Sequence, residues 1–178
     1  MRLRRKRNMR IAIIGSREYE NRNKIKNTIF ELKKMIGDEL LIVSGGTKDG
    51  ADRYAKKYAL ELGCKYMEFN PAHTVHNLYS ACNENFYSKP YSPKNFFVRN
   101  TMMAKYVDRI IAFIPNNVKA NGSHHTLNEA KKYRKKCVII DWFFLYTYIY
   151  IWIYTIEEKS YDDEIDIRED KYWSSEKI

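Results

Sequence analysis

Short apolar runs alternate along the chain with segments in which apolar residues recur at helical spacing. Strand-like runs cover residues 11–14, 40–43, 65–69, 109–114 and 137–140. Helices are predicted around Ile25 to Ile36, where Gly37 ends the pattern, and over residues 51–62, 95–106 and 124–135. Five strands that alternate with four helices predict an α/β fold, a Rossmann-like parallel sheet with helices on both faces.

The pattern changes after Asp141. From Tyr146 to Thr155 the chain alternates between aromatic and aliphatic or threonine residues with period two, which predicts an extended strand that is apolar on both faces. Ile165 and Ile167, between charged neighbours, would pair with it as a C-terminal β-hairpin. The hairpin either packs on the domain or forms the interface of a homodimer or higher oligomer, since a bare apolar edge strand would aggregate.

Length and charge divide the 178 residues into one domain with two appendages. The predicted parts are a basic arm (1–9), an α/β domain (10–141) and a β-rich extension with an acidic tail (142–178). Residues 1–10 carry six basic side chains and no acid, and residues 157–178 carry nine acids against four bases. Of the net charge of +10, residues 11–156 therefore carry +9. This positive charge favours phosphorylated or polyanionic partners. Pairs of lysines in this part of the chain are, however, typical of solvated helix faces.

Cysteine, histidine and apolar content narrow the class of protein. Three cysteines without a CxxC pair indicate a reduced, cytoplasmic protein. The apolar run 142–156 has 15 residues, short of the ~20 of a spanning helix, so no membrane span is expected. His73 and His76, and the adjacent His124 and His125, lack a familiar zinc spacing, so we expect no metal and no cofactor.

Polar and glycine residues follow three of the predicted strands. They form the loops Gly15-Ser16-Arg17, Ser44-Gly45-Gly46 with Asp52-Arg53 close behind, and residues 121–126. Ligands of parallel sheets bind at the carboxyl ends of the strands, where helix N-termini present free N–H groups. Ser123 is a natural N-cap for the helix predicted from residue 124. The loops match neither GxGxxG nor GxxxxGK[ST], which disfavours ordinary dinucleotide and P-loop sites.

These motifs resemble the SLOG superfamily, which unites DprA, the LOG phosphoribohydrolases and small stand-alone nucleotide-binding proteins. The resemblance covers residues 10–140 and rests on Gly15-Ser16-Arg17, Ser44-Gly45-Gly46 with Gly50 to Arg53, Pro71-Ala72, Arg99-Asn100 with Met103, and residues 122–129. It is strongest to the small stand-alone members and implies a nucleotide or nucleotide-derived phosphate ligand, bound by a sensor or processing protein. The expected ligand-binding residues are Gly15, Ser16, Arg17, Ser44, Gly45, Gly46, Asp52, Arg53, Asn100, Gly122, Ser123, His124 and Thr126.

Two alternatives follow from the same resemblance. The LOG motif PGGxGTxxE is partly retained in residues 121–129, where Ser123 and His125 replace two glycines. Its glutamate corresponds to Glu129 and its arginine to Arg99, a pair suited to N-glycosidic cleavage of a nucleoside 5′-monophosphate. In this interpretation Thr126 and Glu129 share a helix face that points at the ligand. The DprA likeness instead implies nucleic acid bound through the basic arm and body.

Overall fold

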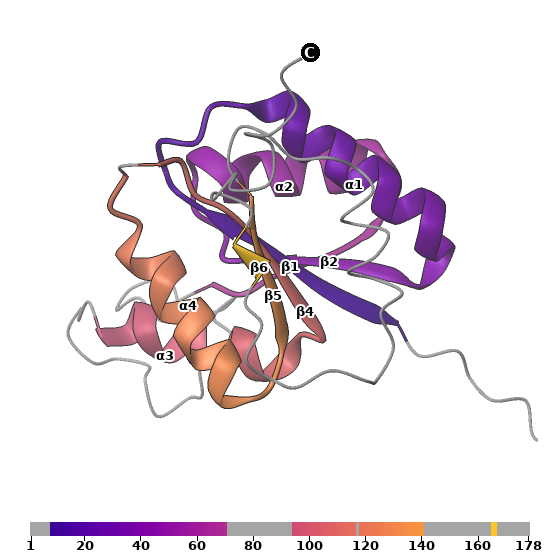
Figure 1. Cartoon of the computed structure of the whole chain (residues 1–178). Coiled ribbons are helices and arrows are strands. Elements are labelled where there is room, and N and C mark those ends of the chain that lie inside the picture. The colour runs from indigo at the N-terminus through magenta and orange to yellow at the C-terminus, as the bar shows by residue number, and fades with distance from the viewer. Residues whose placement is uncertain (1–7, 71–93, 117, 141–164, 167–178) are drawn as a thin grey trace, which may run out of the picture.

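A parallel β-sheet with helices on both faces makes up most of the computed structural model, which describes residues 8–70, 94–116, 118–140 and 165–166 (Figure 1). The strands are β1 (Met9–Gly15), β2 (Leu40–Ser44), β3 (Lys65–Glu68), β4 (Arg109–Phe113), β5 (Lys136–Ile140) and β6 (Ile165–Asp166). The helices are α1 (Arg22–Ile36), α2 (Gly50–Glu61), α3 (Lys94–Tyr106) and α4 (Asn121–Lys132), with a short 3-10 helix at Gly37–Glu39. The predicted α/β Rossmann-like fold is confirmed.

The strand order β3-β2-β1-β4-β5-β6 places β1 in the middle of the sheet. The chain moves outward from β1 to β2 and β3, then returns to the other side of β1 and moves outward again through β4 and β5. Every strand pair is parallel, with Ile11 opposite Ile42 in β2 and Arg109 in β4. This reversal beside β1 opens a crevice at the carboxyl ends of β1 and β4, the usual ligand position in such sheets.

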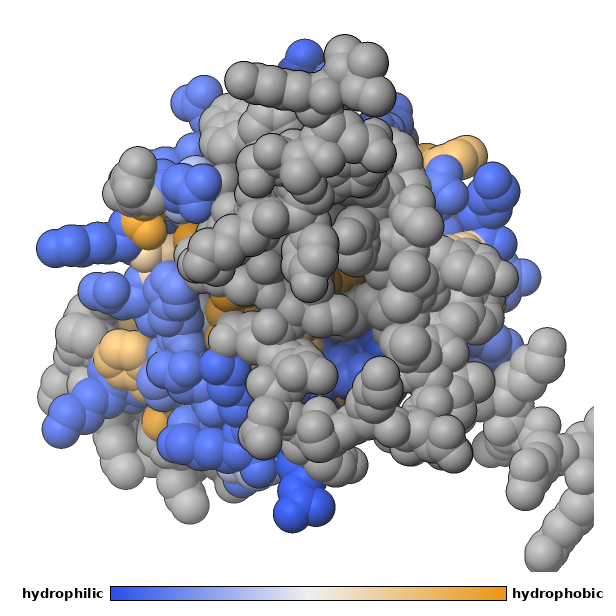
Figure 2. All heavy atoms as spheres, in the orientation of Figure 1, coloured by the Kyte–Doolittle hydropathy of each residue, from blue (hydrophilic) through white to orange (hydrophobic). Residues whose placement is uncertain are grey.

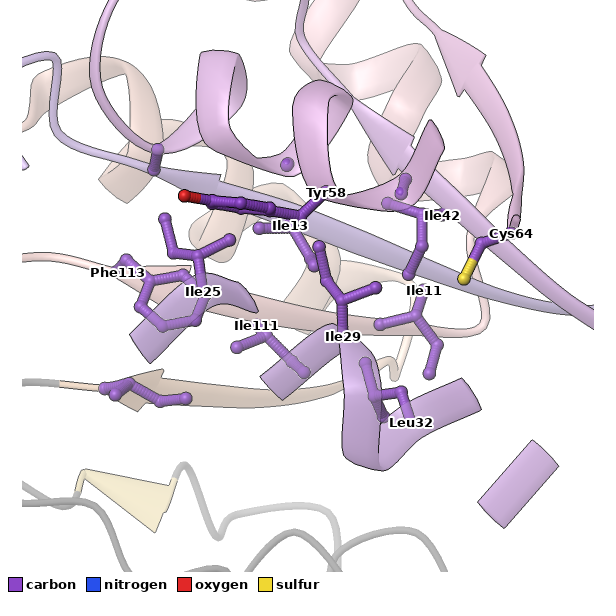
Figure 3. Close-up of a cluster of buried hydrophobic side chains, with 14 of the residues drawn as sticks. Ile11, Ile13, Ile25, Ile29, Leu32, Ile42, Tyr58, Cys64, Ile111 and Phe113 are labelled. Carbon is purple, nitrogen blue, oxygen red and sulfur yellow. The ribbon is translucent and has the colours of Figure 1, made fainter. Parts of the chain in front are cut away.

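Two apolar clusters cover the two faces of the sheet. On one face, Ile25, Ile29 and Leu32 of α1 point toward Ile11 and Ile13 of β1, as Figure 3 shows. Their spacing of three to four residues puts them on one side of the helix, and all three side chains are fully buried. The helices α3 and α4 cover the opposite face (Figure 1). The helical periodicity read from the sequence thus corresponds to real burial.

The helix α4 begins earlier than the sequence predicts. Its first residue is Asn121, with Ala120 at the N-cap, so the expected start at residue 124 is wrong. Ser123 is therefore not the N-cap: it lies inside the first turn, and its hydroxyl donates to the carbonyl oxygen of Gly15 at 2.9 Å. This contact ties the start of α4 to the end of β1.

The region after β5 contributes one described element. A strand forms at Ile165, where the alternation of Ile165 and Ile167 indicated one, and this strand, β6, pairs in parallel with β5 through Ile165 and Val138. Residues 142–164, with the strand expected at 146–155, lie outside the described residues, as does the basic arm up to residue 7. The predicted hairpin, oligomer and domain limits therefore stay predictions.

The described surface seen in Figure 2 is largely hydrophilic, with small apolar patches. The large apolar side chains that are exposed come from different elements: Phe30 in α1, Leu60 in α2, Met67 in β3 and Phe97 in α3. Among the helices of the described ranges, none is long and apolar enough to cross a membrane.

Candidate functional site

A cavity of about 300 Å³ lies at the crevice between the carboxyl ends of β1 and β4. It is bounded by the loop after β1, the loop after β2, one side of α3 and the first turns of α4. The lining residues are Ile14, Gly15, Ser16, Arg17, Glu18, Gly45, Thr47, Asp52, Phe96, Arg99, Asn100, Met103, Lys119, Ala120, Asn121, Gly122, Ser123 and Thr126. The structure therefore brings together residues from all three loops that the sequence singled out.

The loop after β1 rests directly on the start of α2. A Cβ on Gly50 would lie 2.1 Å from the carbonyl oxygen of Ser16, and Gly50 itself has φ +63°. The backbone N–H of Ala51 donates to the same oxygen at 3.2 Å. Only glycine fits this contact without displacing backbone. Gly50 therefore holds Ser16 and Arg17 at the rim of the cavity.

A buried arginine and a buried carboxylate flank Gly45 at the floor of the cavity. Arg99 is 6% exposed, and its Nη1 donates to the carbonyl oxygens of Gly45 and, at 2.9 Å, Phe69. Asp52 accepts a hydrogen bond from the N–H of Thr47 at 3.2 Å. Burial raises the pKa of Asp52, and the nearby Arg99 opposes that rise. A Cβ on Gly45 would lie 2.4 Å from Arg99 Nη1 and 2.8 Å from Asp52 Oδ2, so both side chains would have to shift to accept it.

The first turn of α4 forms the opposite wall. The N-cap residue is Ala120, whose methyl group cannot accept a hydrogen bond from the N–H groups of the turn. Asn100 holds this turn from α3, since its Nδ2 donates to the carbonyl oxygen of Gly122 at 3.1 Å. Thr126 Oγ1 donates to the same oxygen at 3.0 Å. The wall therefore presents backbone donors and the positive end of a helix dipole.

Four of the expected ligand-binding residues lie outside the cavity lining formed by the described residues: Ser44, Gly46, Arg53 and His124. The Ser44 hydroxyl instead contacts the hydroxyl of Tyr66 at 2.6 Å, and that hydroxyl donates to Glu68 Oε2 at 3.1 Å. Lys56 completes the network through an ion pair with Glu68 at 2.9 Å. Burial raises the pKa of Tyr66, which stays a phenol. Ser44 thus links β2 to β3.

Glu129 also lies outside the lining made by the described residues. Its Oε2 accepts from Thr101 Oγ1 at 3.1 Å, and its Oε1 pairs with Lys132 Nζ at 2.5 Å. The hydrogen bond from Lys132 is the main reason that the pKa of Glu129 is lowered. The structure therefore separates Glu129, which joins α4 to α3, from Arg99 and Thr126, which line the cavity.

Sequence reasoning missed several lining residues, among them Phe96, Met103 and Lys119. Met103 stands in the motif Arg99-Asn100-x-x-Met103, and Phe96, one turn before Asn100, shares its helix face. Lys119 had no comparable signal, because it lies in the connection between β4 and α4. Around His124 and His125, and throughout the described ranges, no three His, Cys, Asp or Glu side chains are grouped to hold a metal ion.

A family described as "YAcAr: YspA, cpYpsA-related SLOG family" matches residues 9–76, which include β1 to β3 and the Gly15, Gly45 and Gly50 loops. Over these residues the chain is similar to this SLOG family. No curated protein sequence matches it significantly. The family assignment supports the resemblance inferred from the motifs, and the matched residues supply two of the three SLOG loops around the cavity.

Solved structures share the fold of this chain at low sequence identity. DprA from Helicobacter pylori, described by its single-stranded DNA binding mode, is 22% identical with a TM-score of 0.55, and the match covers 75% of this chain and 65% of that one. DprA from Streptococcus pneumoniae is 21% identical with a TM-score of 0.58, over 78% and 52%. A molybdenum cofactor binding protein from Rippkaea orientalis is 17% identical with a TM-score of 0.56, over 82% and 83%.

The chain spans less than two thirds of the length of either DprA chain. The neighbours bind chemically different partners, single-stranded DNA in one case and a molybdenum cofactor in another. Proteins that share a fold need not bind the same ligand. The ligand class therefore depends on the residues that line this chain's own cavity.

Proposed function

We propose that the SLOG domain binds a nucleotide or nucleotide-derived phosphate ligand in the cavity between β1 and β4, as a sensor or processing protein. The observation that carries the proposal is the first turn of α4, whose N-cap Ala120 leaves backbone N–H groups for a ligand. By contrast, Asn21 caps α1 with its own side chain, accepting from the N–H of Lys24 at 3.1 Å. An N-terminus without a side-chain cap, facing a cavity, suits a phosphate group.

The charge of the lining supports the same ligand. Arg17 and Lys119 are exposed basic side chains at the rim, and Arg99 adds a buried guanidinium at the floor. The acidic lining residues are Glu18 and Asp52, and burial of Asp52 favours its protonated form. The cavity is therefore electropositive toward the α4 side, which is the arrangement that attracts phosphate.

The size of the cavity favours a small molecule over a polymer. Its volume of about 300 Å³ is at the lower end of the range of ~300–1,000 Å³ typical of ligand pockets. Apolar side chains of Ile14, Phe96 and Met103 complete the lining and offer contact surface for a flat base. A phosphate at α4 with a base against these side chains is the pose we propose.

Arg17→Gln is expected to weaken binding of a nucleoside monophosphate about 10-fold or more, because it removes a charge-assisted contact at the rim. The measurement is isothermal titration calorimetry after a melting-shift screen of nucleoside monophosphates, cyclic nucleotides and ADP-ribose-type compounds. Arg53→Gln is the matched control, since Arg53 is exposed and lies outside the lining formed by the described residues. A screen without any melting shift would refute the nucleotide proposal.

Hydrolysis of the N-glycosidic bond, the enzymatic alternative, needs a carboxylate beside the ribose. Glu129 is engaged with Thr101 and Lys132 instead of the cavity. We therefore expect intact ligand, and no free base, when the protein is incubated with nucleoside 5′-monophosphates and the mixture is read by mass spectrometry. Base release by the wild type that disappears in Glu129→Gln would establish the LOG-like reaction and overturn a purely binding role.

A further inference from the structure

Asp52 is a buried acid in the cavity for which an anionic ligand is proposed. It lies in the first turn of α2 and is 9% exposed, whereas Glu18, the other acidic residue of the described lining, is exposed at the rim. The N–H of Thr47 donates to Asp52 Oδ2 at 3.2 Å. A buried carboxylate is costly in its charged form, because the protein interior solvates charge poorly. An anionic ligand in the same cavity would add a second negative charge near it.

One cation and one further acid act most strongly on Asp52. Arg99, from α3, flanks Gly45 together with Asp52 and favours the charged carboxylate. Glu68, from β3, opposes the charged form. The effect of burial is larger than that of Arg99, so the pKa of Asp52 is raised above its ordinary value, and a further negative charge would raise it again. The other charged side chains of the described lining are exposed at the rim: Arg17, Glu18 and Lys119.

We propose that a proton from solvent enters the cavity with the anionic ligand and neutralises Asp52, an inference that rests on the nucleotide-type ligand proposed above. Arg99 then no longer faces two negative charges at once, since the ligand alone remains charged. The protonated carboxyl group also gains an O–H donor, whose hydrogen bond an oxygen of the ligand can accept. The proton returns to solvent when the ligand leaves. Asp52 thereby makes the cavity a proton-linked binding site.

This linkage determines the direction of the pH dependence. Since the bound anion raises the pKa of Asp52 further, binding takes up a proton. Affinity therefore falls as pH rises between the pKa that Asp52 has in the free protein and its higher pKa in the complex. Burial places this interval above the ordinary aspartate pKa of about 4. Within the interval, the affinity of the wild type is expected to fall by up to about 10-fold per pH unit.

The test measures proton uptake by isothermal titration calorimetry, in buffers that differ in ionisation enthalpy and over a series of pH values. The first probe is ADP-ribose, whose phosphates keep a constant charge around neutral pH. The second is AMP, whose own titration near pH ~6 cancels when variants are compared. The wild type is expected to take up as much as one proton per ligand. Asp52→Asn, which keeps the size of the side chain, should take up none with ADP-ribose and should bind it with an affinity that does not change with pH.

Asp49→Asn is the matched control, because Asp49 is an exposed acid close to Asp52 in the chain and lies outside the described lining. It removes the same charge and is expected to keep the proton uptake of the wild type. Equal loss of proton uptake in Asp49→Asn and Asp52→Asn would mean that total charge decides, and would overturn the inference. Binding of ADP-ribose to the wild type without proton uptake would overturn it by itself, whether or not Asp52→Asn folds.

The free protein provides a second measurement that needs no ligand. Because folding raises the pKa of Asp52, the unfolded chain binds fewer protons than the folded chain above a pH of about 4. The free energy of unfolding of the wild type, measured in urea, should therefore fall relative to that of Asp52→Asn as pH rises toward neutral. Identical pH dependences would overturn the inference and leave the nucleotide ligand standing. Binding of neither probe would overturn the proposed function and, with it, the proton linkage.

Discussion

The substitution Gly50→Ala is expected to lower the free energy of unfolding by about 3 kcal/mol or more. The new Cβ would lie 2.1 Å from the carbonyl oxygen of Ser16 and 2.6 Å from Cα of Arg17, and both are backbone atoms that cannot rotate away. The φ of +63° adds the cost of a left-handed conformation. Chemical denaturation of the purified variant measures the loss. The same displacement would move Arg17, so nucleotide binding should fall as well.

Gly63→Ala separates the cost of the steric clash at position 50 from the cost of the positive φ. Gly63 has nearly the same φ, +65°, but a Cβ there would meet no atom within 4 Å. Its substitution should therefore cost only about 1 kcal/mol, the price of the backbone conformation alone. Equal losses of stability at positions 50 and 63 would show that the contact between α2 and the loop after β1 does not constrain the fold.

Arg99→Met is expected to destabilise the fold by about 3–5 kcal/mol and to abolish ligand binding. The variant leaves the carbonyl oxygens of Gly45 and Phe69 without the guanidinium that now donates to them. It also removes the cation that opposes the raised pKa of Asp52, so this buried carboxyl group should take up a proton more readily. Thermal and urea unfolding give the stability, and calorimetry gives the binding.

A double substitution tests whether Arg99 and Asp52 act as a pair. Because Arg99 lowers the cost of ionising the buried Asp52 carboxyl group, and Asp52→Asn removes that group, the double variant should be less destabilised than the sum of the two single variants. Arg99→Lys keeps the positive charge but loses the planar set of donors. Its free energy of unfolding should therefore lie between that of the wild type and that of Arg99→Met. Strict additivity in the cycle would show that the two side chains are energetically independent.

The fold could be predicted from the sequence because its strands are buried on both faces. Continuous runs such as Ile11 to Ile14 are typical of central parallel strands, and the structure places them there. The start of α4 was missed for a local reason. Asn121 and Gly122 are poor helix formers, and Ser123 is a good cap, yet contacts from Gly15 and Asn100 hold an additional turn. The alternation of Ile165 and Ile167 indicated a strand where β6 lies, but it could not show that β5 is the neighbouring strand.

The candidate site was predictable in position but only partly in detail. The carboxyl ends of parallel strands meet at one edge, so the Gly15, Gly45 and Gly122 loops had to converge. Which side chains turn inward depends on contacts from distant residues. Ser44, adjacent to Gly45, binds Tyr66 from β3, and Glu129, one turn beyond Thr126, binds Thr101 from α3. Neither contact has a signature in the local sequence.

The central position of β1 also has a consequence during synthesis on the ribosome. The strands β1, β2 and β3 are neighbours in both sequence and space, whereas Arg10 and Asp108, which bond at the junction of β1 and β4, are 98 residues apart. After β1, β2 and β3 have emerged from the ribosome, the apolar edge of β1 that pairs with β4 stays unpaired until β4 has been translated. That nascent half-sheet is where a folding chaperone would act, and where slow translation would favour aggregation.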